Sequence, residues 1–453
     1  MPYIPNTDED RKRMLHALGL SSTRELFSPV PEHLLLQREL KMAEPLPEVE
    51  IYDYFERMGR SNQIFPAKRN LAGGGVYRHF IPPVVKELVH RGEFYTSYTP
   101  YQAEVSQGIL QCVYEYQSFI CMLTGMEASN ASSYDGATAL ADAVLMAANI
   151  VHRKRVLLPP FLHPQYGEVL QTYSQGRMLA TTVLPATEQG SIETKALQRE
   201  LAAKDVAALV LQVPDFLGYI EPEIPELAAR AHEQGAMVVF VVHPLATGVM
   251  KSPGDLGADI VAGDGQPLGL PASFGGPSFG FLATKKRYIH QLPGRIVGRT
   301  TAAEGKTAFV LTLQAREQHI RRERASSNIC TNQELAAVQA TIYLAALGRS
   351  GFHNVARKCE ENAHYACAKL CEIPGVEHLF SERQWFNEFS LRLPSAQVVD
   401  SAYAGLMEKG WLPGIKLGEL FPQLQEGLSL AFTEVHSPSD IDAFAADFRE
   451  VLG

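Results

Sequence analysis

The chain has 453 residues, a formal net charge of −9 and 46% hydrophobic residues. This length exceeds one ordinary hydrophobic core, so we expect a soluble protein with two domains and a terminal arm. The acidic balance argues against a nucleic-acid partner, because a phosphate-binding face needs an excess of basic residues. No apolar run is long enough for a membrane span, and the acidic start of the sequence lacks the order of a secretion signal, so we expect a cytoplasmic location.

Three regions follow one another along the chain. Residues 1–69 carry short helical segments between prolines and predict an arm that packs on another surface. Residues 70–330 alternate aliphatic runs with helical stretches, which is typical of an α/β domain with a mainly parallel sheet. Residues 331–453 are mainly helical with two alternating stretches, and predict a smaller α+β domain. The strands are expected over 156–158, 207–213, 236–242, 275–284, 386–393 and 428–432, and the helices of the α/β domain over 136–151, 193–203 and 226–234.

The segment from Ala258 to Pro277 predicts a buried strand that leads into a loop rich in glycine and proline. In a pyridoxal-phosphate enzyme of the aspartate-aminotransferase fold, this loop would carry the lysine that binds the cofactor covalently. Gln266 stands at that position, and an amide cannot condense with an aldehyde. The sequence therefore predicts that this chain binds no cofactor covalently.

Two further features of a pyridoxal-phosphate site are missing. The strand that ends at Val242 is followed by His243, where an acid would hold the pyridine nitrogen protonated. A lone histidine at a strand end is more often a polar residue whose hydrogen bonds are satisfied within the fold than a functional residue. The small residues from Ser132 to Thr138 resemble a phosphate-binding helix start, but Asp135 lies among them and would repel phosphate, so a well-capped helix is favoured.

A polar stretch between Tyr98 and Gly108 is the first candidate for a functional site. A helix start would account for Thr99, Pro100 and Gln102 as cap, first position and capping box. A helix start would not explain the phenols, the carboxylate and the second amide of this stretch, which favours a functional role. The candidate residues are Tyr98, Thr99, Tyr101, Gln102, Glu104, Ser106 and Gln107.

A second candidate region runs from Arg316 to Thr331, where a mixed-charge run meets a loop of small polar residues at the expected domain junction. Charge runs are often solvated helix faces, but clefts also form at domain junctions. Arg321, Arg322 and Asn328 are therefore candidates for anion binding or subunit contact. The six cysteines form no pair at metal-binding spacing, so free thiols and no metal site are expected.

Several of these stretches together resemble the P-protein of the glycine cleavage system, glycine decarboxylase. Tyr98–Gly108 is similar to the family signature YTPYQxEVSQG, and residues 293–298 to PGRxVG. Residues 317–331 resemble the block EQHIRRxxAxSNICT, and the loop after Gly265 resembles QxxGxPxxxGGP. The resemblance extends from about Leu36 through Gly351 and more loosely to the C-terminus, and it is to the amino-terminal half of the long form, which split systems make as a separate first subunit.

The resemblance implies a fold-type-I pyridoxal-phosphate architecture in an α2β2 assembly. The second (beta) subunit would carry pyridoxal phosphate, and the complex would decarboxylate glycine and pass the aminomethyl group to the lipoyl arm of the H-protein. The loop from Tyr98 to Gln107 would then contribute in trans to the active site of the partner. Two alternatives remain open from the sequence: a purely structural scaffold, and a self-sufficient enzyme that uses Lys251, Lys285 or Lys286.

Overall fold

The computed structural model describes residues 5–325 and 327–453, which belong to two compact units, one ending at Ile64 and one over Phe65–Gly453. The first unit contains the helices α1 (Asp8–Ala17) and α2 (Glu48–Arg60). None of its described side chains is buried, so it has no hydrophobic core of its own. The prediction that this region packs on another surface is consistent with that exposure and stays a prediction.

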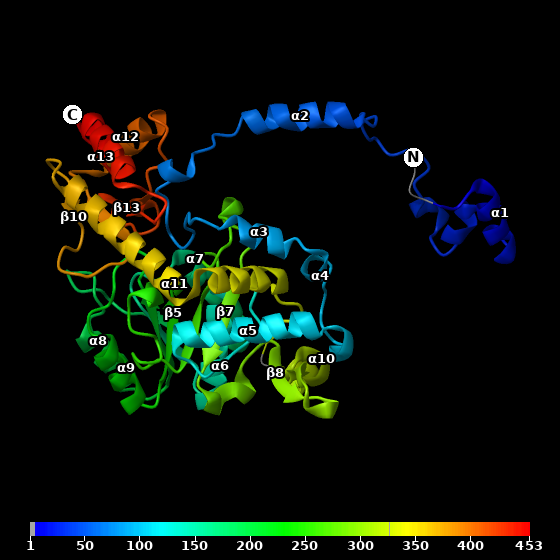
Figure 1. Ribbon diagram of the computed structural model, residues 1–453, viewed down its shortest axis with the longest axis horizontal. Helices are drawn as coiled ribbons and strands as arrows, with labels where there is room; N and C mark the ends of the chain where they lie inside the picture. Colours follow the sequence, from blue (N-terminus) through cyan, green and yellow to red (C-terminus); the bar gives the residue numbers. More distant parts are fainter. Residues whose placement is uncertain (1–4, 326) are drawn as a thin grey trace. The chain divides into compact units, whose positions relative to one another are not determined.

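A seven-stranded sheet forms the centre of the second unit (Figure 1). Its order is β1-β7-β6-β5-β4-β2-β3, and β7 alone among these strands runs antiparallel to its neighbours. The strands are β1 (Ala128–Ser129), β2 (Arg155–Leu158), β3 (Ala180–Val183), β4 (Val206–Val213), β5 (Met237–Val242), β6 (Ile260–Asp264) and β7 (Gly280–Thr284). The expected aliphatic strands are confirmed, but the one expected over 275–284 begins only at Gly280, because the chain turns at Ser273–Gly275.

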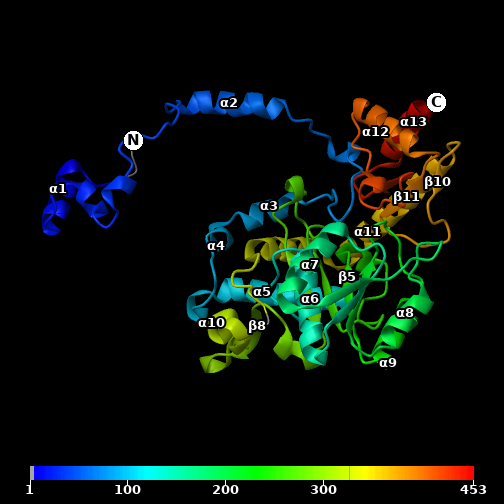
Figure 2. The ribbon, with the colours of Figure 1, turned by 180° about the vertical axis from the view of Figure 1, so that it is seen from behind.

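Helices cover both faces of this sheet (Figures 1 and 2). One face packs against α5 (Gln107–Thr124), α8 (Thr194–Leu201), α9 (Ile224–Glu233) and the first half of α11 (Glu334–Cys371). The other face packs against α6 (Gly136–Val151) and α7 (Pro164–Arg177). Along β5, Phe240 enters the first core while Val239 and Val241 enter the second, so both faces of the strand are apolar. This explains the continuous hydrophobic run in the sequence.

Two short helices and a hairpin lie outside this layered arrangement. The helices α3 (Pro83–Val89) and α4 (Gly92–Tyr95) precede the candidate loop that contains Tyr98. The strands β8 (Ile296–Thr301) and β9 (Thr307–Thr312) form a two-stranded sheet, and α10 (Gln318–Arg321) follows them. The hairpin was not expected from the sequence.

The C-terminal part forms a four-stranded antiparallel sheet in the order β10-β11-β13-β12. Its elements are β10 (Glu377–His378), β11 (Glu388–Arg392), α12 (Ala396–Glu408), β12 (Ile415–Lys416), β13 (Gly427–Ala431) and α13 (Pro438–Leu452). The helix α11 contributes Tyr343 to the large core and Leu370 to the small one, on either side of a non-helical Gly348. The expected boundary at residue 331 thus lies just before a helix that belongs to both cores.

Among the described residues, no helix combines the length and the apolar character that crossing a membrane would require. All six cysteines are free thiols, as the sequence predicts.

The buried carboxyl group of Asp142 links helix α6 to the loop after α10. The Asp142 side chain is 5% exposed in α6, and its Oδ2 accepts a hydrogen bond of 2.9 Å from Ser327 Oγ. Burial raises the pKa of Asp142 from its ordinary 3.8 to about 7. The folded chain therefore keeps a proton on Asp142 that the unfolded chain loses near pH 4.

Replacing Asp142 by asparagine should remove one pH-dependent component of stability. Between about pH 4 and pH 7 the folded state binds more protons than the unfolded state, so the free energy of unfolding falls as the pH rises, by up to about 1.4 kcal/mol per pH unit. Asp142→Asn keeps an acceptor for Ser327 and does not titrate. Urea unfolding at pH 5 and pH 8 should show that the free energy of unfolding of the variant rises relative to that of the wild type as the pH rises. The same difference between the two proteins at both pH values would contradict the buried, protonated carboxyl.

Candidate functional site

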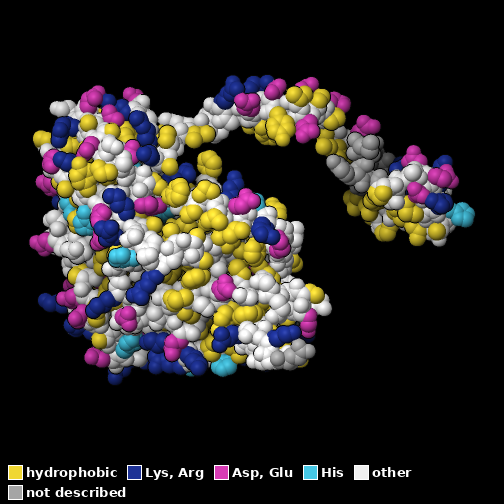
Figure 3. Space-filling model, in the orientation of Figure 1, with side chains coloured by type: hydrophobic (Ala, Val, Ile, Leu, Met, Phe, Trp, Pro, Cys, Tyr) yellow, Lys and Arg dark blue, Asp and Glu magenta, His cyan; other side chains and the backbone are white. Residues whose placement is uncertain are grey.

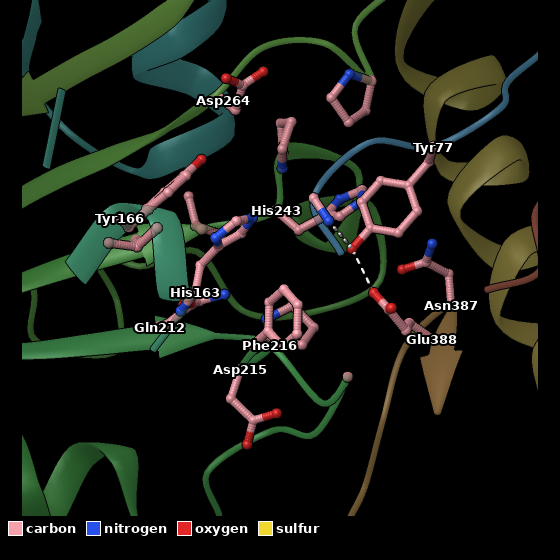
Figure 4. Close-up of a pocket in the computed structure, with 17 residues that line it drawn as sticks. Tyr77, His163, Tyr166, Gln212, Asp215, Phe216, His243, Asp264, Asn387 and Glu388 are labelled. Atoms are coloured by element: carbon pink, nitrogen blue, oxygen red, sulfur yellow. Dashed lines mark hydrogen bonds between the residues drawn. The ribbon is translucent and has the colours of Figure 1, made fainter. Parts of the chain in front are cut away.

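A cavity of about 50 Å³ lies where the carboxyl ends of β4, β5 and β6 meet (Figure 4). Open α/β sheets bind their ligands at this edge. The strands contribute Gln212, His243 and Asp264, and the α7 start contributes His163. The segment before α3 adds Tyr77, and the small sheet adds Asn387 and Glu388 from the start of β11.

The position that a phosphate group would need is taken by carboxylates of the chain itself. Asp264 Oδ2 accepts a hydrogen bond of 3.0 Å from the backbone N–H of Gly136, the first residue of α6. Asp135 caps the same helix by accepting from Thr138 N–H at 2.8 Å. Helix N-termini attract anions through these N–H groups, and here the anions are internal. The well-capped helix favoured by the sequence is confirmed.

Gln266 holds the backbone of the segment before α3. Its side chain is 3% exposed, its Nε2 donates to Tyr77 O at 3.0 Å and to Leu270 O at 2.8 Å, and its Oε1 accepts from Tyr77 N–H at 3.0 Å. A lysine ammonium could donate to both carbonyls, but it offers no acceptor for the Tyr77 N–H. The amide at this position is thus a structural part of the cavity wall.

Aromatic rings fill much of the remaining space. His243 lies 4.7 Å from the Tyr77 ring, and His163 stacks on Tyr166 at 4.6 Å and meets Phe216 edge-on at 4.9 Å. Burial lowers the pKa of His243 to about 3, so its imidazole is neutral. The expectation that His243 is hydrogen-bonded holds for one ring nitrogen. Nδ1 accepts from Leu245 N–H at 3.2 Å, while Nε2 has no hydrogen-bond partner among the described residues.

Pyridoxal phosphate does not fit this cavity. The space is too small for a substituted pyridine with a phosphate ester, the phosphate position is anionic, and no lysine lies in the lining. Lys285 and Lys286 follow β7, which runs antiparallel and ends at the opposite edge of the sheet. Lys285 is also paired there with Asp259 at 2.8 Å, and Lys251 is exposed outside the cavity lining.

The loop that contains Tyr98 has an irregular, extended course rather than the helix start considered from the sequence. No helix begins at Thr99 or Pro100, because only a short turn over Ala103–Val105 precedes α5, which starts at Gln107. Tyr98 and Tyr101 are 74% and 60% exposed. The loop thus presents its phenols to solvent in the isolated chain.

A buried arginine, Arg295, holds this loop in place from inside the chain. Its side chain, 4% exposed, lies at the start of the β8–β9 hairpin and donates from Nη2 to Tyr101 Oη at 3.0 Å and from Nη1 to Thr99 Oγ1 at 3.2 Å. Its Nε lies 3.8 Å from Glu317 Oε2. A buried guanidinium with a fixed fork of donors is well suited to holding two side chains at once.

A cleft of about 490 Å³ opens beside Arg295. It is lined by Tyr101, Arg295, Glu317, Gln318, His319, Arg322, Glu323, Ile329 and Cys330. These residues come from three of the motif blocks found in the sequence, which the fold brings together. Arg295 Nε and Glu317 Oε1 are buried and have no hydrogen-bond partner among the residues that the structure describes, so the cleft keeps unused polar capacity.

The other predicted site residues divide into three groups. Gln107 is engaged with the backbone, since its amide accepts from Phe309 N–H at 2.9 Å and donates to Phe309 O and Ala103 O at 2.8 Å. Gln102 and Glu104 are exposed on the loop, and Ser106 is half-buried beside α5. Arg322 reaches the cleft, whereas Arg321 and Asn328 are exposed and do not line it.

One group of possible metal ligands exists among the described residues. His79, Cys359 and Glu434 offer ligand atoms within 4.8 Å of one another. Hydrogen bonds already join them, since His79 Nδ1 lies 2.8 Å from Glu434 Oε2 and Cys359 Sγ donates to the same oxygen at 3.2 Å. The group links the segment before α3, the helix α11 and the small domain.

Sequence reasoning missed three residues that define these sites. Arg295 lies within the segment 293–298 that resembles PGRxVG, but the sequence alone assigns it no role. Asp264 and Glu388 gave no signal, because a single acid at a strand end is common. Their roles in the cavity depend on hydrogen bonds to residues more than 100 positions away in the sequence.

Comparison with known proteins supports the same family. The model of the glycine cleavage system P-protein family matches residues 1–448. Probable glycine dehydrogenase (decarboxylating) subunit 1 of Moorella thermoacetica is 45% identical over 100% of both chains, and that of Desulfitobacterium hafniense is 43% identical over 100% of both. The chain belongs to the P-protein family.

The solved structures give the same result. A crystal structure of glycine decarboxylase (P-protein) in inhibitor-bound form matches with a TM-score of 0.90 and 43% identity over 100% of both chains. A glutamate decarboxylase of Lactobacillus brevis matches with a TM-score of 0.66 at 13% identity and covers 94% of this chain and 97% of that one, which shows the fold alone. The predicted fold-type-I pyridoxal-phosphate architecture is thereby confirmed.

Introducing a lysine at position 266 should not create a cofactor site. Gln266→Lys removes the amide that binds the Tyr77 backbone but leaves the Asp264 and Asp135 carboxylates at the α6 N-terminus. After incubation with pyridoxal phosphate and borohydride, peptide mapping should find no more label at position 266 than on exposed lysines such as Lys251. Stoichiometric label at the introduced lysine would show that the cavity accepts the cofactor after all.

Proposed function

We propose that this chain is the cofactor-free first subunit of a glycine dehydrogenase (decarboxylating) and completes in trans an active site on its partner subunit. In this reaction glycine loses its carboxylate as carbon dioxide, and the aminomethyl group passes to the lipoyl arm of the H-protein. Pyridoxal phosphate on the partner subunit supplies the electron sink. The observation that carries the proposal is a cavity that does not fit the cofactor, in a chain that matches subunit 1 relatives from end to end.

The loop that contains Tyr98 supports the contribution in trans. Arg295 fixes the Tyr101 phenol and the Thr99 hydroxyl from inside the chain. Tyr98, Gln102 and Glu104 remain exposed on the same loop, and their side chains form no hydrogen bond with any residue that the structure describes. Polar groups held at a surface by a buried arginine are available to a second subunit at low cost in conformational entropy.

The surface around the loop has the character of an interface. Figure 3 shows hydrophobic side chains gathered over α3, α5 and the first half of α11. Large apolar side chains exposed in these elements and the loops beside them include Phe80, Val84, Tyr95, Tyr98, Tyr101, Val105, Met122 and Leu335. Aromatic residues and methionine are enriched at protein–protein interfaces, and a patch of this kind supports docking of the partner subunit here.

Tyr101→Phe should lower glycine decarboxylation by the reconstituted complex about tenfold to a hundredfold, because the ring stays while the hydroxyl that Arg295 holds is lost. Glycine–bicarbonate exchange and size-exclusion chromatography would measure activity and assembly on the same sample. Tyr365→Phe is the matched control, since it removes a tyrosine hydrogen bond of 2.7 Å to Asp442 on the surface of the small domain. Unchanged turnover in Tyr101→Phe and Glu104→Gln alike would leave only a scaffold role for the loop.

The N-terminal arm supports assembly through a second surface. Ile51, Phe55 and Met58 lie at positions i, i+4 and i+7 of α2 and are 40%, 63% and 51% exposed. This spacing places them on one face of the helix. A helix with such a face and no core of its own gains stability only when that face is covered, and we assign the covering surface to the partner subunit.

Replacing Ile51, Phe55 and Met58 together by serine should weaken binding of the partner subunit about a hundredfold or more, because each buried apolar side chain contributes roughly 1.5–3 kcal/mol. Affinity would be measured by titration of labelled partner subunit. The control replaces Glu50, Asp53 and Arg57 by serine on the opposite face of the same helix. Equal affinity in both triple variants would mean that the arm packs elsewhere.

A further inference from the structure

We propose that the cavity between Tyr77, His243 and Glu388 binds one small zwitterionic amino acid, with glycine as the simplest occupant. This site would be separate from the active site on the partner subunit. The inference rests on the charges, the unpartnered polar atoms and the size of the cavity (Figure 4). It holds or fails independently of the catalytic role of the loop that contains Tyr98.

Two buried carboxyl groups in the wall lack a cation. Glu388 is 3% exposed and is bound by Tyr77 Oη at 2.7 Å, Gly74 N–H at 2.9 Å and Ser429 Oγ at 3.0 Å. Asp264 is bound by hydroxyl and backbone N–H donors. Neither carboxyl forms an ion pair with any residue that the structure describes, whereas Asp215 in the same wall is paired with Arg383 at 2.9 Å.

Buried carboxylates without a counter-ion are costly, and burial raises the pKa of both Asp264 and Glu388 above the ordinary values. A positive charge inside the cavity would favour their ionised forms. The same wall repels phosphate and other anions that bring no cation with them. The charge of the site therefore selects for an ammonium group.

Unpartnered polar atoms specify the rest of the ligand. His243 Nε2 carries the proton of the neutral ring, because Nδ1 accepts from Leu245 N–H. No acceptor for this Nε2–H is found in the described part of the chain. Asn387 is 1% exposed, and its Nδ2 also lacks an acceptor. His163 has the opposite need: its Nε2 lies 2.9 Å from Gly74 O and donates to it, which leaves Nδ1 as a buried acceptor without a donor.

A ligand that satisfies this wall needs both an ammonium group and an acceptor such as a carboxylate. The ammonium group of the ligand would donate a hydrogen bond to His163 Nδ1 and be attracted by the two carboxyl groups of the wall. The carboxylate of the ligand would accept hydrogen bonds from His243 and Asn387. The cavity of about 50 Å³ limits the ligand to a few heavy atoms, since a single water needs roughly 10–15 Å³ by the same measure. Glycine meets these limits, and amino acids with branched side chains exceed them.

Isothermal titration of the full chain, without partner subunit or cofactor, tests the proposal with four probes: glycine, methylamine, acetate and valine. We expect saturable binding of glycine with one site per chain, and binding at least about tenfold weaker for the other three, because each lacks one of the charges or exceeds the space. No saturable glycine binding would overturn the proposal and leave ordered water as the occupant. If methylamine bound as tightly as glycine, the cavity would be a site for cations only, and the proposal of a zwitterionic ligand would be overturned.

Asn387→Leu removes the unpartnered amide donor at similar volume and should weaken glycine binding about tenfold. Asn354→Leu is the matched control, because Asn354 is exposed on α11 and does not line the cavity. Circular dichroism of both variants shows whether they fold. Wild-type affinity in a folded Asn387→Leu chain would contradict the assignment, and the probe series on the wild-type chain decides the question if that variant does not fold. Failure here would leave turnover of the complex, the measure of the catalytic proposal, unaffected.

Discussion

The hydrogen bond from the Gly136 N–H to the Asp264 carboxylate determines what the central cavity can hold. In an α/β fold the N-terminus of a helix beside the sheet edge is the natural place for a phosphate. Here that place holds a carboxylate of the chain, fixed further by the Gln266 N–H at 2.9 Å. The cofactor is thus excluded by charge as well as by the missing amine, and one substitution cannot reverse both.

Much of the large domain could be predicted from the sequence, because its strands are buried on both faces. Val206–Val213 and Met237–Val242 are aliphatic throughout, and this leaves little ambiguity. The β8–β9 hairpin was missed, because Arg299, Thr300 and Thr301 are exposed and Gly298 interrupts its first strand. The turn at Ser273–Gly275 shortened another expected strand through two consecutive non-glycine residues with positive φ, which no local pattern announces.

The candidate site was predictable in its chemistry and not in its geometry. Gln266 could be recognised as a non-reacting residue from its position after a buried strand, but its two hydrogen bonds with the Tyr77 backbone join residues 189 positions apart. The loop that contains Tyr98 could be recognised from its excess of polar side chains. The arginine that fixes it lies 194 positions from Tyr101, and only the fold brings the two together.

The two sites differ in how their charges are balanced. In the cleft, the buried Arg295 faces Glu317 and donates hydrogen bonds to Thr99 and Tyr101 of the loop. In the cavity, Asp264 and Glu388 find donors but no cation among the described residues. The side chains of Tyr98, Gln102 and Glu104 on the loop are exposed, whereas the residues that line the cavity all belong to this chain and are largely buried. Gln266 and Asp264 bind the Tyr77 backbone and the Gly136 N–H, so these parts of the cavity wall are held by hydrogen bonds within the chain.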